Sequence, residues 1–165
     1  MEKVTTFDDL CLDNLRDIYD SEHQIAKLLP TITNAATSAN LKKAFVSHQK
    51  QTEEHITRLE QVFDLMGKKP TRKVCKATKG LLAEGVQHIT EIQKGALLDA
   101  ALIEGMQKME HYEIASYGTI RAFATRVGKS DVAHLLEETL KDVEATDRLL
   151  TEIAETIVNR EAASK

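Results

Sequence analysis

The sequence predicts an all-α protein built as a bundle of four long helices, and three observations support this prediction. Residues that favour helices dominate the 165-residue chain, which has only 7 Gly and 2 Pro. Apolar residues recur at alternating steps of three and four, a spacing that puts them on one face of a helix. The length suits one core of ordinary size, so we expect a single domain over residues 1–165 with its core at about 5–159.

Composition also narrows the classes of function. The formal net charge of −4 gives no global attraction to nucleic acid or to anionic membranes. No apolar run is long enough to span a bilayer, and MEKVTTFDDL lacks the apolar core of a signal peptide, so we expect a cytoplasmic protein without a membrane partner. Cys11 and Cys75 are far apart and belong to no CxxC or Cys/His cluster, which predicts two separate reduced thiols.

The first predicted helix opens after Thr6, which forms a capping-box pattern with Asp9. Its apolar stripe runs to Ala36 and has one polar exception, Glu22. Pro30 lies inside the stripe and removes one backbone hydrogen bond. Because the stripe continues beyond Pro30, we expect a kink there and not the end of the helix.

The second predicted helix starts at Asn40, a suitable N-cap, and ends at Gly67. Two histidines, His48 and His55, lie on its apolar stripe. Residues 68–79 then contain six basic residues and no acidic one. Such a run is most often a solvated loop, so binding of nucleic acid or an acidic partner through it is a minor alternative function.

A connection of about thirty residues follows, with a weaker helical pattern around 81–92 that predicts a short helix. The third predicted long helix runs from about Leu97 to Val127. Its apolar stripe includes two carboxylates, Glu110 and Glu113, where a bundle core is normally apolar. Carboxylates at core-facing positions make these two residues candidates for a functional site.

The third and fourth helices should form a tight antiparallel hairpin, because Gly128 suits the C′ position and Ser130 suits an N-cap. The fourth helix extends to about Ile157, with Asp147 as the polar exception on its stripe. Two hairpins joined by a connection long enough to run the length of the bundle give the order up-down-down-up. This is the one-crossover arrangement of ferritin-like folds.

The polar exceptions of the two hairpins are expected to meet in one layer. In an antiparallel hairpin, residues equally far from the turn lie at the same level. By this count Glu22 of the first helix is level with His55 of the second, and Glu144 and Asp147 of the fourth helix lie beside the two glutamates of the third. The candidate metal ligands are therefore Glu22, His55, Glu110, Glu113, Asp147, Glu144 and, about two turns from this layer, His48.

Buried carboxylates that lack partners either take up protons or draw in cations. Carboxylates together with imidazole suit iron or manganese, and ferritin-like dimetal sites use Glu-x-x-His motifs from two of the helices. The match is partial, because Thr52 stands three residues before His55. For Glu110 and Glu113, three interpretations stay open: metal ligands, a metal-free buried network of hydrogen bonds and salt bridges, or an exposed helix face.

Two tyrosines lie close to the candidate ligands. Tyr19 is one turn from Glu22, and Tyr117 is one turn from Glu113. Each is placed either to donate a hydrogen bond to a carboxylate or to pack in the core.

Four stretches resemble the bacterial YciE/YciF family of ferritin-like, stress-associated proteins, whose biochemical activity is not settled. They are DIYDSEHQIAKLLP, SHQKQTEEHITRLEQVF, DAALIEGMQKMEHYEIASYGT and LLEETLKDVEATDRLLTEIA. The similarity covers about residues 5–157, and MEHYEIASYGT is its most specific part. The resemblance implies a ferritin-like bundle, a homodimer, dimetal binding and a link to stress responses.

The resemblance also carries over to single positions. His55 occupies a position where the family accepts Gln or His, and the other matching residues are Glu22, His48, Glu110, Glu113 and Asp147. The chain departs from the family at Gln51, where Glu is frequent, and at Asp142-Val143, where the family has a Glu pair. Gln is a poor ligand and Val is none.

These observations lead to two functional hypotheses of different classes. The first is a ferritin-like protein that binds one or two iron or manganese ions, with peroxide- or oxygen-linked chemistry. The second is a metal-free structural or scaffold dimer with a vestigial site. The sequence contains no nucleophile–base pair, phosphate loop or hydrolase motif, so it assigns no catalytic residue and no substrate.

Overall fold

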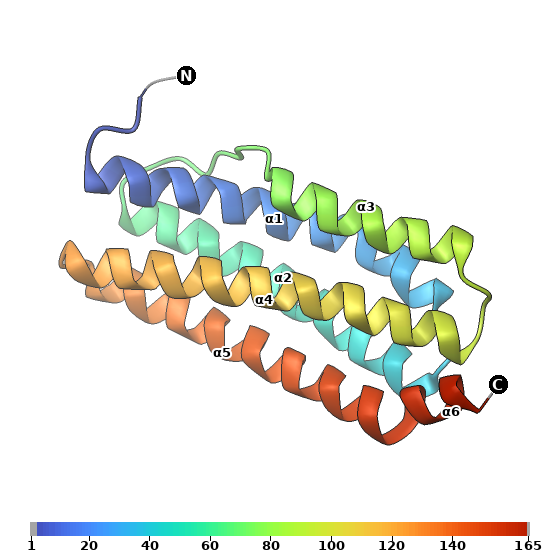
Figure 1. Ribbon diagram of the computed structural model, residues 1–165. Coiled ribbons are helices and arrows are strands. Elements are labelled where there is room, and N and C mark those ends of the chain that lie inside the picture. The colour runs from blue at the N-terminus through green and yellow to red at the C-terminus, as the bar shows by residue number, and fades with distance from the viewer. Residues whose placement is uncertain (1–2, 165) are drawn as a thin grey trace.

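The computed structural model describes residues 3–164 and confirms the all-α prediction (Figure 1). Its helices are α1 (Phe7–Ala35), α2 (Ala39–Leu65), α3 (Lys76–Glu91), α4 (Ala96–Arg126), α5 (Ser130–Ile153), the π-helical segment η1 (Ala154–Val158) and α6 (Asn159–Ala163). Within residues 3–164, no helix combines the length and the hydropathy that crossing a bilayer requires.

Four long helices, α1, α2, α4 and α5, form the bundle, and their order is up-down-down-up (Figure 1). The connection between α2 and α4 runs back along the bundle, and α3 packs on α1 and α4 as a fifth helix. This helix starts at Lys76, earlier than the apolar pattern around 81–92 indicates. The reason is local, because the thiol of Cys75 accepts the backbone N–H of Thr78 at 3.5 Å and caps the helix.

The first helix begins and continues as the sequence predicts. The Thr6 hydroxyl accepts the backbone N–H of Asp9 at 3.1 Å, and the Asp9 carboxylate accepts the backbone N–H of Thr6 at 3.1 Å, which completes the capping box. The helix runs through Pro30 without ending.

Two predicted N-caps are wrong. The cap of α2 is Ser38 and not Asn40, and its hydroxyl accepts the backbone N–H of Leu41 at 3.4 Å. Ser130 is the first residue of α5, and the cap position is taken by Lys129, which makes no side-chain capping bond. The preceding Gly128 has a φ of +74°, the left-handed conformation that favours glycine after a helix.

The early start of α2 has a tertiary cause in Asp99, a buried residue of α4. Its carboxylate accepts the backbone N–H groups of Thr37 and Ser38 at 2.7 and 2.8 Å and the Thr37 hydroxyl at 2.5 Å. The α1–α2 turn is therefore fixed by a residue distant in sequence, which a local capping rule does not include.

The Asp99→Ala substitution is expected to lower the free energy of unfolding by about 3 kcal/mol, because it leaves two backbone N–H groups without their charged acceptor. Chemical denaturation measures this change. Asp131→Ala is the control, since Asp131 is exposed in the first turn of α5 and contributes at most about 1 kcal/mol to the free energy of unfolding there. Equal losses in the two variants would contradict the role of Asp99.

The basic segment 68–79 lies against α1 in part. Arg72 Nε donates to Asp20 at 2.9 Å, and Lys73 Nζ donates to Asp13 at 2.6 Å. The Asp20 carboxylate also accepts the backbone N–H of Cys75 at 2.8 Å. Two of the basic side chains thus hold the crossover on the bundle.

The apolar core is divided into two clusters along the bundle axis. On α1, for example, Tyr19 belongs to one cluster and Ile25 to the other, with Glu22 between them. The same order occurs on α2 and α4, so a buried polar layer separates the clusters. Its fully or nearly buried members are Glu22, His48, Thr52, His55, Glu110 and Glu113.

Candidate metal centre

Three helices bring five ionisable side chains into the polar layer. Glu22 comes from α1, His48 and His55 come from α2, and Glu110 and Glu113 come from α4. Each of them is at most 2% exposed. Their spacings of three and seven residues keep each pair on one helix face, which is why the apolar stripes reveal them in the sequence.

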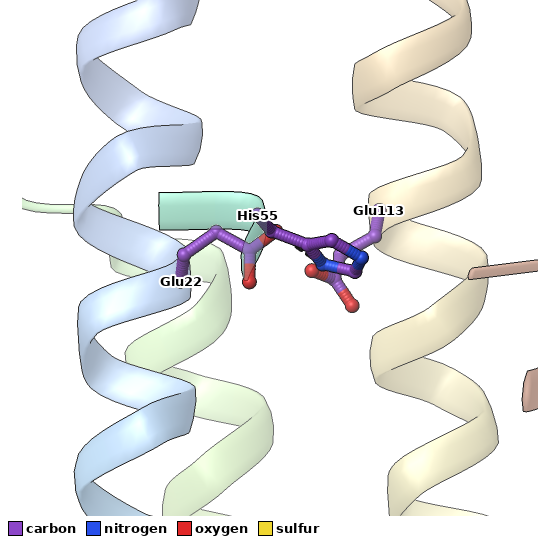
Figure 2. A group of neighbouring side chains, drawn as sticks. All are labelled: Glu22, His55 and Glu113. Atoms are coloured by element: carbon purple, nitrogen blue, oxygen red, sulfur yellow. Dashed lines mark ion pairs between the residues drawn. The ribbon is translucent and has the colours of Figure 1, made fainter. Parts of the chain in front are cut away.

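These side chains form two groups of three that share one carboxylate. In the first group, donor atoms of Glu22, His55 and Glu113 lie within 4.8 Å of one another. Figure 2 shows these three side chains pointing toward one another. In the second group, His48, Glu110 and Glu113 meet the same limit. We call these the Glu22 triad and the His48 triad. Glu113 belongs to both.

Most of the nitrogen and oxygen atoms with which the two triads could bind a metal lack a hydrogen-bond partner. These atoms are Glu22 Oε2, His48 Nδ1, both nitrogens of His55 and all four carboxylate oxygens of Glu110 and Glu113. His55 Nδ1 is 3.2 Å from Glu22 Oε1 and His48 Nδ1 is 3.3 Å from Glu110 Oε1, but neither contact is aligned as a hydrogen bond. Buried polar atoms without partners are costly, and a cation bound between them would relieve that cost.

Burial strongly affects the protonation of the His48 triad. It raises the pKa values of Glu110 and Glu113 well above the ordinary carboxyl value, and the charge of Glu22 raises both further. Burial also lowers the pKa of His48 to about 4. Burial therefore favours protonated glutamates and a neutral imidazole in the metal-free triad, and a cation would replace the protons of the glutamates.

The Glu22 triad differs because its carboxylate has partners. Burial acts to raise the pKa of Glu22, but the electrostatic interaction with His55 and the hydrogen bond from Tyr117 outweigh burial and lower this pKa. The phenol of Tyr117 donates to Glu22 Oε1 at 2.5 Å, which confirms one of the alternatives for that tyrosine. Tyr19 instead donates to Glu60 at 2.9 Å.

His48 lies nearer to the layer than its sequence position predicts. The prediction placed it about two turns away, whereas its Nδ1 is 3.3 Å from Glu110. Reflection of a hairpin about its turn places only residues at one level along the bundle axis, whereas the layer extends along this axis. On α2, His48 precedes His55 by about 10 Å at the helical rise, and on α4, Glu110 precedes Glu113 by about 4.5 Å. Because α2 and α4 run parallel, both displacements point toward the same end of the bundle, and His48 therefore lies near Glu110.

Two candidate residues of α5 belong to neither triad. The Asp147 carboxylate contacts His111 Nε2 at 3.3 Å and accepts from Gln107 Nε2 at 3.1 Å. Glu144 is half-buried. The fully buried Val143 is the residue that α5 presents to the core near this level.

Sequence reasoning missed one carboxylate that approaches the layer, Asp142 of α5. Its Oδ2 is 3.5 Å from His55 Nε2. The sequence marked Asp142 only as a departure from the family pattern, and the signal that could have found it is its level opposite His55. Gln51, the other departure, accepts the Thr146 hydroxyl at 3.2 Å and so bridges α2 and α5.

Comparisons with known proteins agree on one family. The family model described as "Domain of unknown function (DUF892)" matches residues 6–163. Protein YciF of Escherichia coli (strain K12) is 38% identical over 163 residues, which is 98% of each chain.

Solved structures give the same result. The crystal structure of the E. coli stress protein YciF has a TM-score of 0.91 at 38% identity and covers 94% of this chain and 99% of that chain. YcfI from Rhodopseudomonas palustris has a TM-score of 0.89 at 39% identity and covers 91% and 96%. A Xanthomonas campestris protein, with a TM-score of 0.78 at 18% identity over 96% and 98%, shows the fold alone.

Proposed function

Because this chain belongs to the DUF892 family, to which its resemblance to the YciE/YciF proteins pointed, we propose that it is a stress-associated protein that binds one or two iron or manganese ions in its bundle core. The observation that carries this proposal is the set of buried carboxylate and imidazole atoms without hydrogen-bond partners. A structural network would be expected to pair these atoms with one another or with donors from neighbouring helices.

The donor types support the choice of metal. Each triad offers carboxylate oxygen together with one imidazole, a combination that suits iron and manganese better than magnesium or calcium. Glu22, His55 and Glu113 would hold one ion, and His48 and Glu110 would hold a second that shares Glu113. Such ions change oxidation state and would supply redox chemistry linked to peroxide or oxygen.

The protein shields the proposed metal site from bulk water and holds its ligand side chains in place. Both triads are closed off by the apolar clusters above and below, which exclude bulk water from the layer. Tyr117 fixes one oxygen of Glu22 and leaves the other without a protein partner. The burial that raises its pKa keeps the phenol protonated and therefore a donor.

Binding of Mn²⁺ is expected to release protons and to tighten as the pH rises. The pKa values of Glu110 and Glu113 are raised in the folded protein, so the stability these groups give to the metal-free fold is lost as the pH rises through those values. A cation then replaces the protons. Calorimetric titration in buffers of different ionisation enthalpy measures the release, and proton-independent binding would contradict these protonation states.

Oligomeric state and location remain predictions. The resemblance implies a homodimer, which light scattering of the purified protein tests directly. We also propose a cytoplasmic location, which fractionation of cells that produce the protein tests.

A further inference from the structure

The buried triads can exchange ions with solvent only through an opening in the bundle. Glu22, Glu110 and Glu113 have no exposed surface, and the two histidines of the triads are at most 2% exposed. A cation must lose its water and pass between helices to reach these side chains. The pair of helices that separates most readily therefore determines the route of entry.

The helix α3 covers the seam between α1 and α4 at the level of the Glu22 triad. It packs on both helices and starts near the middle of the bundle (Figure 1). The hydroxyl of Thr78 lies 2.6 Å from that of Ser21 on α1, and the thiol of Cys75 lies 3.0 Å from the hydroxyl of Tyr112 on α4. Ser21 and Tyr112 each immediately precede a glutamate of the Glu22 triad. The start of α3 thus lies directly outside the buried layer.

The contacts that hold α3 on the bundle are weak for a helix of its length. Only Thr78 and Gly85 are buried among its sixteen residues. The apolar side chains of α3 that pack on the core are only partly buried, namely Leu81, Leu82 and Ile89. Gly80 and Gly85 lower the stability of the helix relative to alanine, although a methyl group at either position would meet no neighbouring atom of the described residues within 4 Å. These properties are typical of a segment that opens locally.

The charges beside α3 also differ from those on the opposite side of the bundle. Beneath α3, α1 contributes the carboxylates of Asp17 and Asp20. Arg72, which pairs with Asp20 at 2.9 Å, belongs to the connection before α3 and would move away with it. On the opposite side, Arg58 of α2 donates to Asp142 of α5 and places a guanidinium in that seam. An opening beside α3 therefore attracts a cation, whereas an opening between α2 and α5 exposes a positive charge.

We propose that α3 is a lid, whose local opening lets cations pass between α1 and α4 on their way to and from the triads. The inference rests on the proposed function and deepens it, because it assigns the route by which ions reach the site. Since α3 contributes no residue to either triad, its opening changes the rates of ion entry and ion release by the same factor. The dissociation constant of the ion stays unchanged.

The test uses one matched pair of variants and one opposite change. Valine has nearly the shape of threonine but lacks the hydroxyl. Thr78→Val removes the hydrogen bond to Ser21 beneath α3, and Thr146→Val removes the hydrogen bond to Gln51 between α2 and α5. Gly80→Ala is the opposite change, because alanine strengthens the α3 helix.

The rate of Mn²⁺ release measures the opening in the loaded protein. Native protein and variants are mixed with an excess of a fluorescent chelator that Mn²⁺ quenches. Thr78→Val is expected to release the ion roughly tenfold faster than the native protein, Gly80→Ala about fivefold more slowly, and Thr146→Val at the native rate. Calorimetric titration should give the same dissociation constant for all four proteins.

Hydrogen exchange followed by mass spectrometry detects the opening without any ion. In the metal-free protein, amides of α3 are expected to exchange faster than those in the middle of α4, and Thr78→Val should accelerate exchange in α3 and not in α5. Exchange in α3 as slow as in α4, or equal rates of Mn²⁺ release from Thr78→Val and Thr146→Val, would overturn the lid and leave the proposed function intact. If the native protein binds no Mn²⁺, the proposed function fails and the lid fails with it.

Discussion

The Glu113→Gln substitution is expected to abolish binding of both ions and, at the same time, to stabilise the metal-free protein. Glu113 is the one residue common to the two triads, so its loss removes a ligand from each. The decrease in affinity should exceed the roughly 100-fold that a change outside the ligand set causes. Glutamine keeps the shape of the side chain and is neutral without taking up the proton that burial forces on Glu113.

The stability change follows from the surroundings of Glu113. Its side chain is fully buried, neither carboxylate oxygen has a hydrogen-bond partner, and burial raises its pKa well above the ordinary value. Replacing such a group with a neutral one should raise the free energy of unfolding by about 1–3 kcal/mol at neutral pH. Denaturation of metal-free protein measures this difference.

Glu144→Gln is the matched control, because Glu144 is a half-buried glutamate of α5 that belongs to neither triad. It should change stability by less than about 0.5 kcal/mol and leave ion binding intact. A Glu113→Gln protein that is less stable than the native one and still binds both ions would show that the carboxylate serves a structural network.

Saturating Mn²⁺ is expected to raise the melting temperature of the native protein by roughly 5–10 °C. An ion that binds only the folded state at a hundredfold excess over its Kd adds about 2.7 kcal/mol, and each kcal/mol shifts the melting temperature of a domain this size by about 2–4 °C. Thermal denaturation followed by circular dichroism measures the shift.

Mg²⁺ is the control ion, since it prefers oxygen ligands and gives up its water reluctantly. It should produce a much smaller shift than Mn²⁺, and the Glu113→Gln protein should show no shift with either ion. Equal shifts with both ions would indicate binding to surface carboxylates and not to the buried triads.

Periodicity and capping predicted most of the fold because these are local properties. The alternating apolar stripes revealed the four long helices, and the polar exceptions on those stripes included Glu22, His55, Glu110 and Glu113. A buried charge on an apolar stripe is costly enough to be informative without any knowledge of the partner helix. The start of α2 was misplaced because it depends on Asp99, a tertiary contact.

The rest of the candidate site depends on how the helices sit against one another. The approach of His48 to Glu110 follows from the parallel course of α2 and α4. The separation of Asp147 from the triads follows from the rotation of α5, which turns this carboxylate toward His111. The apolar stripe of one helix carries no information about how far that helix is shifted or rotated relative to its neighbours. The stripes therefore predict the polar layer but not its exact members.

The most direct test of the metal-centre proposal is the metal content of protein purified without chelator and loaded anaerobically with Fe²⁺ or Mn²⁺. Elemental analysis should find one or two ions per native chain and none in Glu113→Gln. If the native protein retains no ion after loading, the account is contradicted, and the buried triads belong to a metal-free structural protein.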